Sequence, residues 1–168
     1  PKNFENELVL KKRERKVLLT IDDAFLSFYE NAWPILKKEK IPFILFVNTR
    51  EIGSFNYMNW SQIKEIHKEN FVTIGNHSHS HEYLVDESTS VIKEDILKSI
   101  KILKEQLGED LNFFSYPFGE YSLEFINIIK SLNFKYAFGQ HSGVIDESKD
   151  FFEFPRFPIN EKYGDLKR

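Results

Sequence analysis

Apolar residues gather in five short runs along the chain, and longer stretches of mixed polarity separate them. The runs are 17–21, 43–47, 71–75, 113–116 and 136–138. Most positions in each run are apolar, without a regular alternation of apolar and polar residues. Such runs are typical of strands that are buried on both faces of a parallel sheet. The pattern therefore predicts five parallel strands.

The stretches between the runs have the apolar spacing of amphipathic helices. The expected helices cover 31–40, 62–69, 89–107 and 123–132. Ser61 and Ser122 are the expected N-caps of two of them, and Gly108 is the expected end of the longest. A last piece, 152–159, reads as a strand interrupted by two prolines.

Strand and helix alternate about five times, which predicts an α/β fold with a parallel sheet. The count is too small for a barrel of eight units, so a distorted or incomplete (β/α) barrel suits the length better. The 168 residues are long enough for one domain with a sizeable core. We expect a single catalytic domain over 1–168, with 1–15 as a polar lead-in.

Composition and charge exclude several classes of function. The net charge of −3 gives no nucleic-acid footprint, and the basic run 11–16 is short and interrupted by a glutamate. The chain has no cysteine, so any metal must be held by histidine and carboxylate. No run approaches the roughly 18 apolar residues of a membrane span, and no signal peptide opens the chain.

Polar residues follow several of the predicted strands directly. Asp22 and Asp23 follow the first strand, a cluster of three histidines follows the third, and His141 follows the fifth. The carboxyl ends of parallel strands meet at one rim, where the working residues of such folds collect. These separate segments therefore predict a metal site at that rim.

Three of the five histidines lie within five residues, at His77, His79 and His81. Two imidazoles and one carboxylate leave an open position on a hydrolytic zinc ion. His77 and His81 are four residues apart, so one helical turn after the strand would direct both to one side. If the segment stayed extended, all three would share a face. We favour His77 and His81 as the ligands.

The adjacent carboxylates suit a division of labour. Neighbouring side chains on an extended stretch point in opposite directions, so only one of Asp22 and Asp23 is expected to bind the metal. The other can lie close enough to accept a proton from metal-bound water. The alternative is that the pair belongs to a turn or caps a helix.

Three motifs resemble, in order, those of the NodB-homology polysaccharide deacetylases (carbohydrate esterase family 4). They are Thr20-Ile21-Asp22-Asp23, His77-Ser78-His79-Ser80-His81 and Tyr116-Pro117-Phe118-Gly119. The family has Thr-Phe-Asp-Asp, then His-Ser/Thr-x-x-His, then Arg-x-Pro-Tyr/Phe. The resemblance spans roughly 16–145 and implies the NodB-like type of incomplete barrel.

The resemblance implies Asp22 as the general base, and Asp23, His77 and His81 as ligands of a divalent metal, usually zinc. The implied reaction is hydrolysis of an N-acetyl group on an amino sugar, in which Asp22 takes a proton from metal-bound water.

The third motif is implied to serve the oxyanion and the substrate. The metal and the backbone N–H of Phe118 would stabilise the tetrahedral oxyanion. Pro117 restricts Tyr116 to extended geometry, which would help to aim that N–H.

The chain departs from the family pattern at two motifs. Ala24 replaces the glycine that usually follows Asp-Asp, and Ser115 stands where the third motif has its arginine. In the family that arginine braces the catalytic aspartate. Arg156 is the candidate to supply a guanidinium from a later strand, and the alternative is an ordinary surface arginine.

The late Leu-x-His motif, which carries the family's general acid, is absent. His141 is the remaining histidine on the expected rim, where it could be the acid, bind substrate or lie in a loop. Trp60, Tyr83, Phe118 and Tyr121 are candidates for stacking on sugar rings, with ordinary packing as the alternative.

The sequence therefore predicts a metal-dependent hydrolase that removes N-acetyl groups from an amino-sugar polysaccharide or oligosaccharide. One alternative is an O-acetyl esterase of the xylan type, or a small-amide deacylase, with the same site. Another is a non-catalytic carbohydrate-binding relic. An N-acetylated saccharide is the expected partner and zinc the expected metal. The implied substrate favours the cell envelope or the exterior, and the oligomeric state is open.

Overall fold

A computed structural model describes residue 4, residues 15–145 and residues 150–159 of the chain. Most of the predicted polar lead-in, 1–15, therefore lies outside the described residues.

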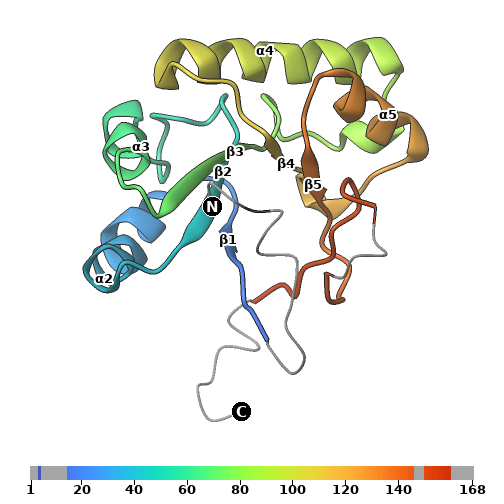
Figure 1. The fold of residues 1–168 in the computed structure, drawn as a ribbon. Coiled ribbons are helices and arrows are strands. Elements are labelled where there is room, and N and C mark those ends of the chain that lie inside the picture. The colour runs from blue at the N-terminus through green and yellow to red at the C-terminus, as the bar shows by residue number, and fades with distance from the viewer. Residues whose placement is uncertain (1–3, 5–14, 146–149, 160–168) are drawn as a thin grey trace.

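The predicted sheet is confirmed, with five parallel strands in the order β1-β2-β3-β4-β5. The strands are β1 (Leu19–Ile21), β2 (Phe43–Val47), β3 (Val72–Asn76), β4 (Phe113–Ser115) and β5 (Tyr136–Phe138). Each strand pairs with the one that follows it in the chain, which is the order of a barrel wall. The sheet curls into a half-barrel, so the predicted incomplete barrel is confirmed (Figure 1).

The helices form an arc around the curled sheet (Figure 1). They are α2 (Trp33–Glu39), α3 (Trp60–His67), α4 (Thr89–Leu107) and α5 (Leu123–Ser131). A π-helical turn, Phe28–Ala32, precedes α2, and two short 3-10 turns occur at Leu84–Asp86 and Pro117–Gly119. Gly108, with φ of 80°, ends α4 as expected.

Both faces of the sheet are covered, which explains the uninterrupted apolar runs. In β2, Leu45 and Val47 pack with the core beneath the helices, whereas Ile44 and Phe46 belong to an aromatic cluster on the other face. Gly75 in β3 makes room for that cluster, because a Cβ at this position would lie 2.3 Å from a ring carbon of Phe46.

Two local predictions are corrected. The N-cap of α3 is Asn59 rather than Ser61: the Asn59 side chain accepts the Gln62 N–H, and the Gln62 side chain accepts the Asn59 N–H. This reciprocal pair is a capping box, and it starts the helix two residues before the predicted first residue. The piece 152–159 is not a strand, because only Phe154 forms a bridge, to Phe138 of β5.

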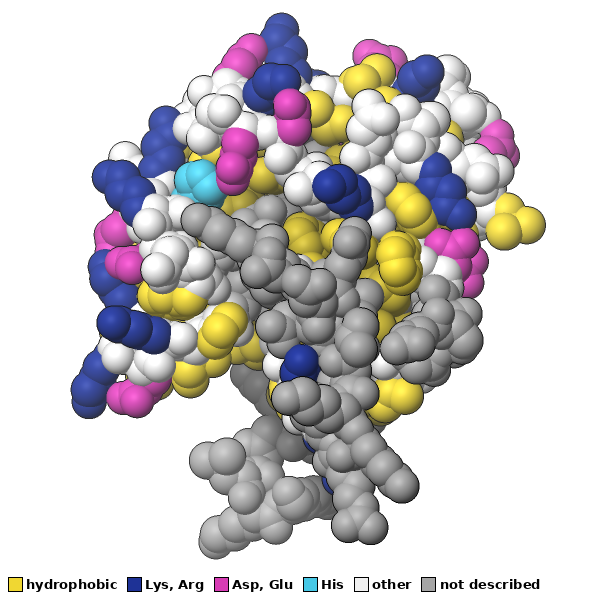
Figure 2. All heavy atoms as spheres, viewed as in Figure 1, with side chains coloured by type: hydrophobic (Ala, Val, Ile, Leu, Met, Phe, Trp, Pro, Cys, Tyr) yellow, Lys and Arg dark blue, Asp and Glu magenta, His cyan; other side chains and the backbone are white. Residues whose placement is uncertain are grey.

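The surface seen in Figure 2 carries Lys, Arg, Asp and Glu side chains of both signs, interspersed over the outer helices. Among the described residues, no helix combines the length and apolar character that crossing a membrane requires.

Candidate metal and catalytic site

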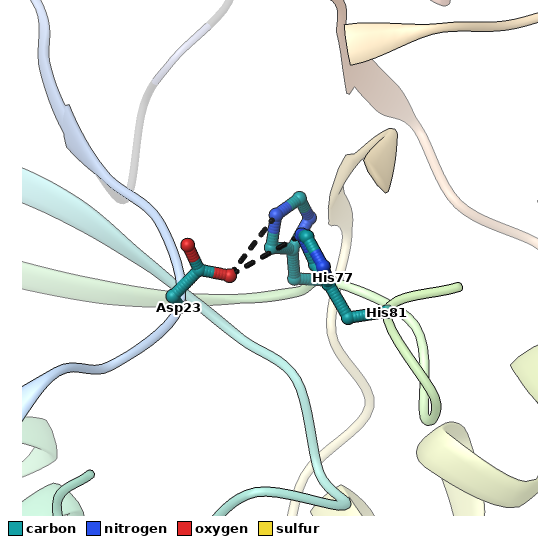
Figure 3. A group of neighbouring side chains, drawn as sticks. All are labelled: Asp23, His77 and His81. Carbon is teal, nitrogen blue, oxygen red and sulfur yellow. Dashed lines mark ion pairs between the residues drawn. The ribbon is translucent and has the colours of Figure 1, made fainter. Parts of the chain in front are cut away.

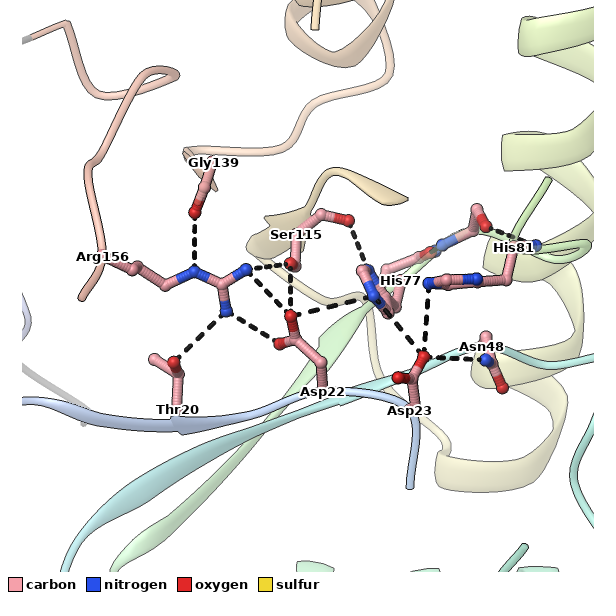
Figure 4. A network of polar contacts seen from close by, with 11 residues as sticks. Thr20, Asp22, Asp23, Asn48, His77, His81, Ser115, Gly139 and Arg156 are labelled. Carbon is pink, nitrogen blue, oxygen red and sulfur yellow. Dashed lines mark hydrogen bonds and ion pairs between the residues drawn. The ribbon is translucent and has the colours of Figure 1, made fainter. Parts of the chain in front are cut away.

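Polar side chains from several separate segments meet at the carboxyl ends of the strands (Figure 4). Asp22 and Asp23 directly follow β1, His77 directly follows β3, and Ser115 is the last residue of β4. Arg156 reaches the same place from the segment that follows the Phe154 bridge. The rim that the strand pattern predicted is therefore where the candidate chemistry lies.

The side chains of Asp23, His77 and His81 converge on one point (Figure 3). Asp23 Oδ1 lies 3.3 Å from His81 Nε2 and 3.7 Å from His77 Nε2. One ligand atom from each of the three residues lies within 4.8 Å of the others. The structure thus brings together the three residues that the sequence singled out as ligands.

The backbone between the two histidines differs from the predicted helical turn. Residues 79 and 80 form a bend, and Ser78 and His81 have left-handed φ angles of 66° and 54°. His79 turns aside, and its Nδ1 lies 2.8 Å from Thr49 Oγ1. The pairing of His77 with His81 therefore arises from two left-handed residues rather than from helical spacing.

Contacts of the histidine rings favour metal binding through Nε2. His77 Nδ1 lies 2.7 Å from the carbonyl oxygen of Ser115, which can only accept a hydrogen bond, so Nδ1 is the donor and Nε2 is directed at the aspartates. Burial and the neighbouring His77 lower the pKa of His81 against the opposing effect of Asp23 and Asp22. A lowered pKa keeps His81 neutral at neutral pH, as a ligand must be.

The donor set fits a divalent metal such as zinc. Tetrahedral ligands about 2.1 Å from zinc lie about 3.4 Å from one another, close to the separations of Asp23 Oδ1 from the two histidines. Asn48 Nδ2 donates to the same Asp23 oxygen at 3.1 Å. The Asn48 side chain thus holds Asp23 through Nδ2, while its Oδ1 is buried without a hydrogen-bond partner in the described structure.

Asp22 lies beside this centre and is held by Arg156 through both carboxylate oxygens. Nη1 donates to Oδ1 and Nη2 to Oδ2, each at 2.8 Å. Asp22 Oδ2 also accepts the Ser115 hydroxyl at 3.3 Å and lies 3.8 Å from His77 Nε2. Burial alone would raise the pKa of Asp22, but His77, Arg156 and Ser115 together lower it below its usual value.

Arg156 also donates to Ser115, which stands where the third motif of the family has its arginine, and to two further groups. Its Nη2 donates to Ser115 Oγ at 2.9 Å, its Nε to the Gly139 carbonyl at 2.7 Å, and its Nη1 to Thr20 Oγ1 at 3.2 Å. The Arg156 side chain is only 11% exposed. The alternative of an ordinary surface arginine is therefore excluded.

The third motif separates into buried and exposed parts. Tyr116 is fully buried and its hydroxyl donates to the Phe152 carbonyl at 3.1 Å, so its ring does not line the site. Pro117 is also buried. Phe118 has a left-handed φ of 58° and is 51% exposed, with its ring centre 4.8 Å from that of His81.

His141 lies at the edge of the site. It is exposed, its Nδ1 is 3.5 Å from the Tyr121 hydroxyl, and its carbonyl accepts the Arg156 N–H at 3.0 Å. It lines an open hollow together with five neighbours: Phe118, Gly119, Glu120, Tyr121 and Gln140. Among the described residues, no hydrogen bond or ion pair joins its side chain to the two aspartates.

Two of the aromatic candidates, Tyr83 and Phe118, form an exposed pair near His81. Tyr83 is 48% exposed and its ring centre lies 5.9 Å from that of Phe118, which makes a pair beside His81. Trp60 instead packs against the core. Tyr121 packs on Tyr116 and also lines the open hollow beside His141.

Sequence reasoning missed two polar residues of the site. Asn48 directly follows β2. Looking for polar residues directly after each strand, which indicates the aspartates and histidines, would therefore also indicate Asn48. Asp95 lies within α4, where nothing in the helical pattern sets it apart from the other charged residues. Its contacts are described below.

Together, the half-barrel and its rim bring two histidines and one carboxylate together beside a second, arginine-held carboxylate. The sequence model of the polysaccharide deacetylase family matches residues 10–137 of the chain. The chain therefore belongs to the polysaccharide deacetylase family.

Two curated staphylococcal proteins are similar to the chain over most of its length. The chain is 29% identical over 161 residues to the poly-beta-1,6-N-acetyl-D-glucosamine N-deacetylase of Staphylococcus aureus, covering 88% of this chain and 56% of that protein. It is 28% identical over 160 residues to the Staphylococcus epidermidis protein of the same name, covering 88% and 55%. The chain thus spans about half the length of these curated relatives.

Two solved structures share the fold closely. IcaB from Ammonifex degensii is 29% identical, with a TM-score of 0.82 over 87% of this chain and 68% of that chain. The Streptococcus pyogenes deacetylase PplD, solved in complex with acetate, is 26% identical, with a TM-score of 0.85 over 94% and 70%. The NodB-like form of the half-barrel is thereby confirmed.

Proposed function

We propose that the chain is a metal-dependent deacetylase that hydrolyses N-acetyl groups on an amino-sugar polysaccharide. The observation that carries the proposal is the convergence of Asp23, His77 and His81 beside a separate carboxylate, Asp22. Hydrolytic zinc centres have three protein ligands of this kind and leave one coordination position open. A divalent ion held by Asp23, His77 and His81 would supply a Lewis acid for the acetyl carbonyl and for water.

Asp22 is assigned as the general base. It borders the ligand cluster, and its lowered pKa keeps it ionised at neutral pH, in the form that accepts a proton. Arg156 holds both of its oxygens, which fixes the direction from which the carboxylate meets an attacking water.

The turn Pro117–Gly119 is assigned to the developing oxyanion. The N–H groups of Gly119 and Glu120 already donate to carbonyls within the turn, at 2.8 and 3.2 Å. The N–H of Phe118, next to the His81 ring, is the proposed donor to the tetrahedral oxyanion. His141, on the segment after β5, is the proposed donor of a proton to the leaving amine.

The proposed substrate is a polymer of N-acetylglucosamine, which two relatives carry in their names. The exposed pair of Tyr83 and Phe118 supports a saccharide substrate, because aromatic faces pack against the apolar faces of sugar rings. Such a polymer would place the activity in the cell envelope or outside the cell.

The test is acetate release from β-1,6-linked N-acetylglucosamine oligosaccharides by the wild-type chain, with and without a chelator, and by Asp22→Asn. We expect release that the chelator abolishes and that added zinc restores. Asp22→Asn should lower kcat by about 10²–10⁴-fold, because it removes the base, while the metal content stays unchanged.

Release that persists in chelator, or full activity of Asp22→Asn, would contradict the mechanism. Release from O-acetylated xylan oligosaccharides but not from the amino-sugar oligomers would instead identify an esterase. Saccharide binding by a metal-loaded chain without turnover would favour the non-catalytic alternative.

A further inference from the structure

The five backbone N–H groups from His77 to His81 are all bound, and four of them are bound by side chains. His77 N–H donates to the Val47 carbonyl at 3.0 Å. Ser78 N–H donates to Asn76 Oδ1 at 2.8 Å, and His81 N–H donates to Ser78 Oγ at 3.0 Å. The two central amides, of His79 and Ser80, are left for an acceptor from elsewhere in the fold.

That acceptor is Asp95, a half-buried residue of α4. Its Oδ1 accepts the His79 N–H at 2.8 Å and its Oδ2 accepts the Ser80 N–H at 3.0 Å. One carboxylate therefore binds two consecutive amides. Hydrogen bonds from N–H groups to an ionised carboxylate are among the stronger ones in proteins.

Residues 49 and 50, which follow β2, bind carbonyl groups of the same loop. Thr49 N–H donates to the Ser78 carbonyl at 3.2 Å, and Arg50 N–H donates to the His79 carbonyl at 3.0 Å. The Thr49 hydroxyl also contacts the ring of His79. The loop is thus held on two sides, with two of its N–H groups bound to Asp95 of α4 and two of its carbonyls bound to residues 49 and 50.

The backbone of this loop includes conformations that cost free energy, and the surrounding contacts must offset that cost. Ser78 and His81 are non-glycine residues with left-handed φ angles, which is a conformation that surrounding contacts must enforce. Asp95 binds the two residues between them, so it is well placed to stop the loop from relaxing. Relaxation of His81 would move its Nε2 away from Asp23 Oδ1, now 3.3 Å distant.

We infer that Asp95 is a positioning residue that fixes the His77–His81 loop in the geometry that binds the metal. It touches neither the proposed ligand atoms nor the substrate, and acts through the amides of His79 and Ser80. The inference rests on the proposed metal site. It also gives His79 a role, since that residue anchors the loop instead of binding the metal.

The test compares Asp95→Asn with Glu94→Gln in the full chain. Both variants remove one negative charge from α4, but Glu94 is exposed. Asp95→Asn keeps the size of the side chain and leaves one acceptor oxygen, so the chain should still fold. Zinc affinity is measured by competition with a chelator, and amide hydrogen exchange of the metal-free chain is followed at residues 79 and 80.

We expect Asp95→Asn to weaken zinc binding by about 10–100-fold, as supporting contacts of metal sites do, and to speed exchange at residues 79 and 80. The visible absorption of the cobalt-loaded variant should also change, because displaced His81 alters the ligand geometry. Glu94→Gln should match the wild type in all three measurements.

Wild-type zinc affinity and unchanged exchange in Asp95→Asn would overturn the inference, as would equal losses in Glu94→Gln. If the wild-type chain itself bound no zinc, the proposed function would fail separately. Exchange at residues 79 and 80 would then decide whether Asp95 holds the loop, because that measurement needs no metal.

Discussion

The contact between Asp22 and Arg156 joins residues that lie 134 positions apart in the chain. Both oxygens of Asp22 and both terminal nitrogens of Arg156 take part, which is the strongest geometry for this pair of groups. The two side chains are 17% and 11% exposed, so solvent screens their attraction only weakly. Arg156 therefore favours the ionised form of the proposed base.

Replacing Arg156 with Met should move the acid limb of the pH profile of kcat/KM to higher pH. In the wild type the pKa of Asp22 is lowered, so the carboxylate loses its charge only below the usual range. Without the guanidinium, burial raises that pKa and the base becomes protonated at higher pH. The measurement is acetate release as a function of pH, with Lys37→Met as an exposed control.

The same substitution should alter stability. A carboxylate with a lowered pKa stabilises the fold above its unfolded-state pKa, and this contribution is lost as pH falls through the folded-state value. Arg156→Met should therefore cost roughly 3 kcal/mol at pH 7 in urea unfolding, and less in acid. An acid limb that stays in place would contradict the assignment of Asp22 as the arginine-held base.

At the scale of elements, substitutions at the start of α3 can test whether Asn59 or Ser61 is the N-cap. Asn59→Ala removes the side-chain acceptor of the capping box and should destabilise the chain by about 1 kcal/mol in urea unfolding. Ser61→Ala changes a residue inside the first turn and should have little effect. A larger loss of stability from Ser61→Ala than from Asn59→Ala would contradict Asn59 as the N-cap and favour Ser61.

The strands were predictable because both faces of the sheet are buried, which leaves continuous apolar runs in the sequence. The sequence does not distinguish Asn59 from Ser61 as the N-cap, because Asn and Ser are both good N-caps and the choice depends on where the helix starts. The spacing of His77 and His81 predicts a helical turn, whereas two left-handed residues bring these side chains together. The four-residue spacing indicates that the two side chains lie close together, but it does not show the backbone conformation that brings them together.

Long-range contacts set the limit of sequence reasoning at the site. Arg156 is a candidate because Ser115 stands where the family has an arginine, yet only the fold shows that the Arg156 side chain reaches Asp22. Asp95 has no comparable signal, since a charged residue on an amphipathic helix is ordinary. Its importance depends on how α4 packs beside the loop after β3.

At the scale of the whole molecule, the curled sheet gathers the candidate groups at one rim. The proposed ligands come from the ends of β1 and β3, and the arginine comes from a segment beside β5 (Figures 1 and 4). A metal bound there ties together parts of the fold that are distant in sequence. An ion that binds only the folded chain also stabilises it, by about 2.7 kcal/mol at a concentration of 100 Kd.

The central claim, a metal held by Asp23, His77 and His81, is tested most directly by zinc stoichiometry and affinity. The comparison is between the wild type, His81→Ala and His67→Ala, where His67 lies in α3 and pairs with Glu109. We predict one tightly bound zinc per chain in the wild type and in His67→Ala, and none in His81→Ala. One zinc bound to His81→Ala with wild-type affinity would contradict the account.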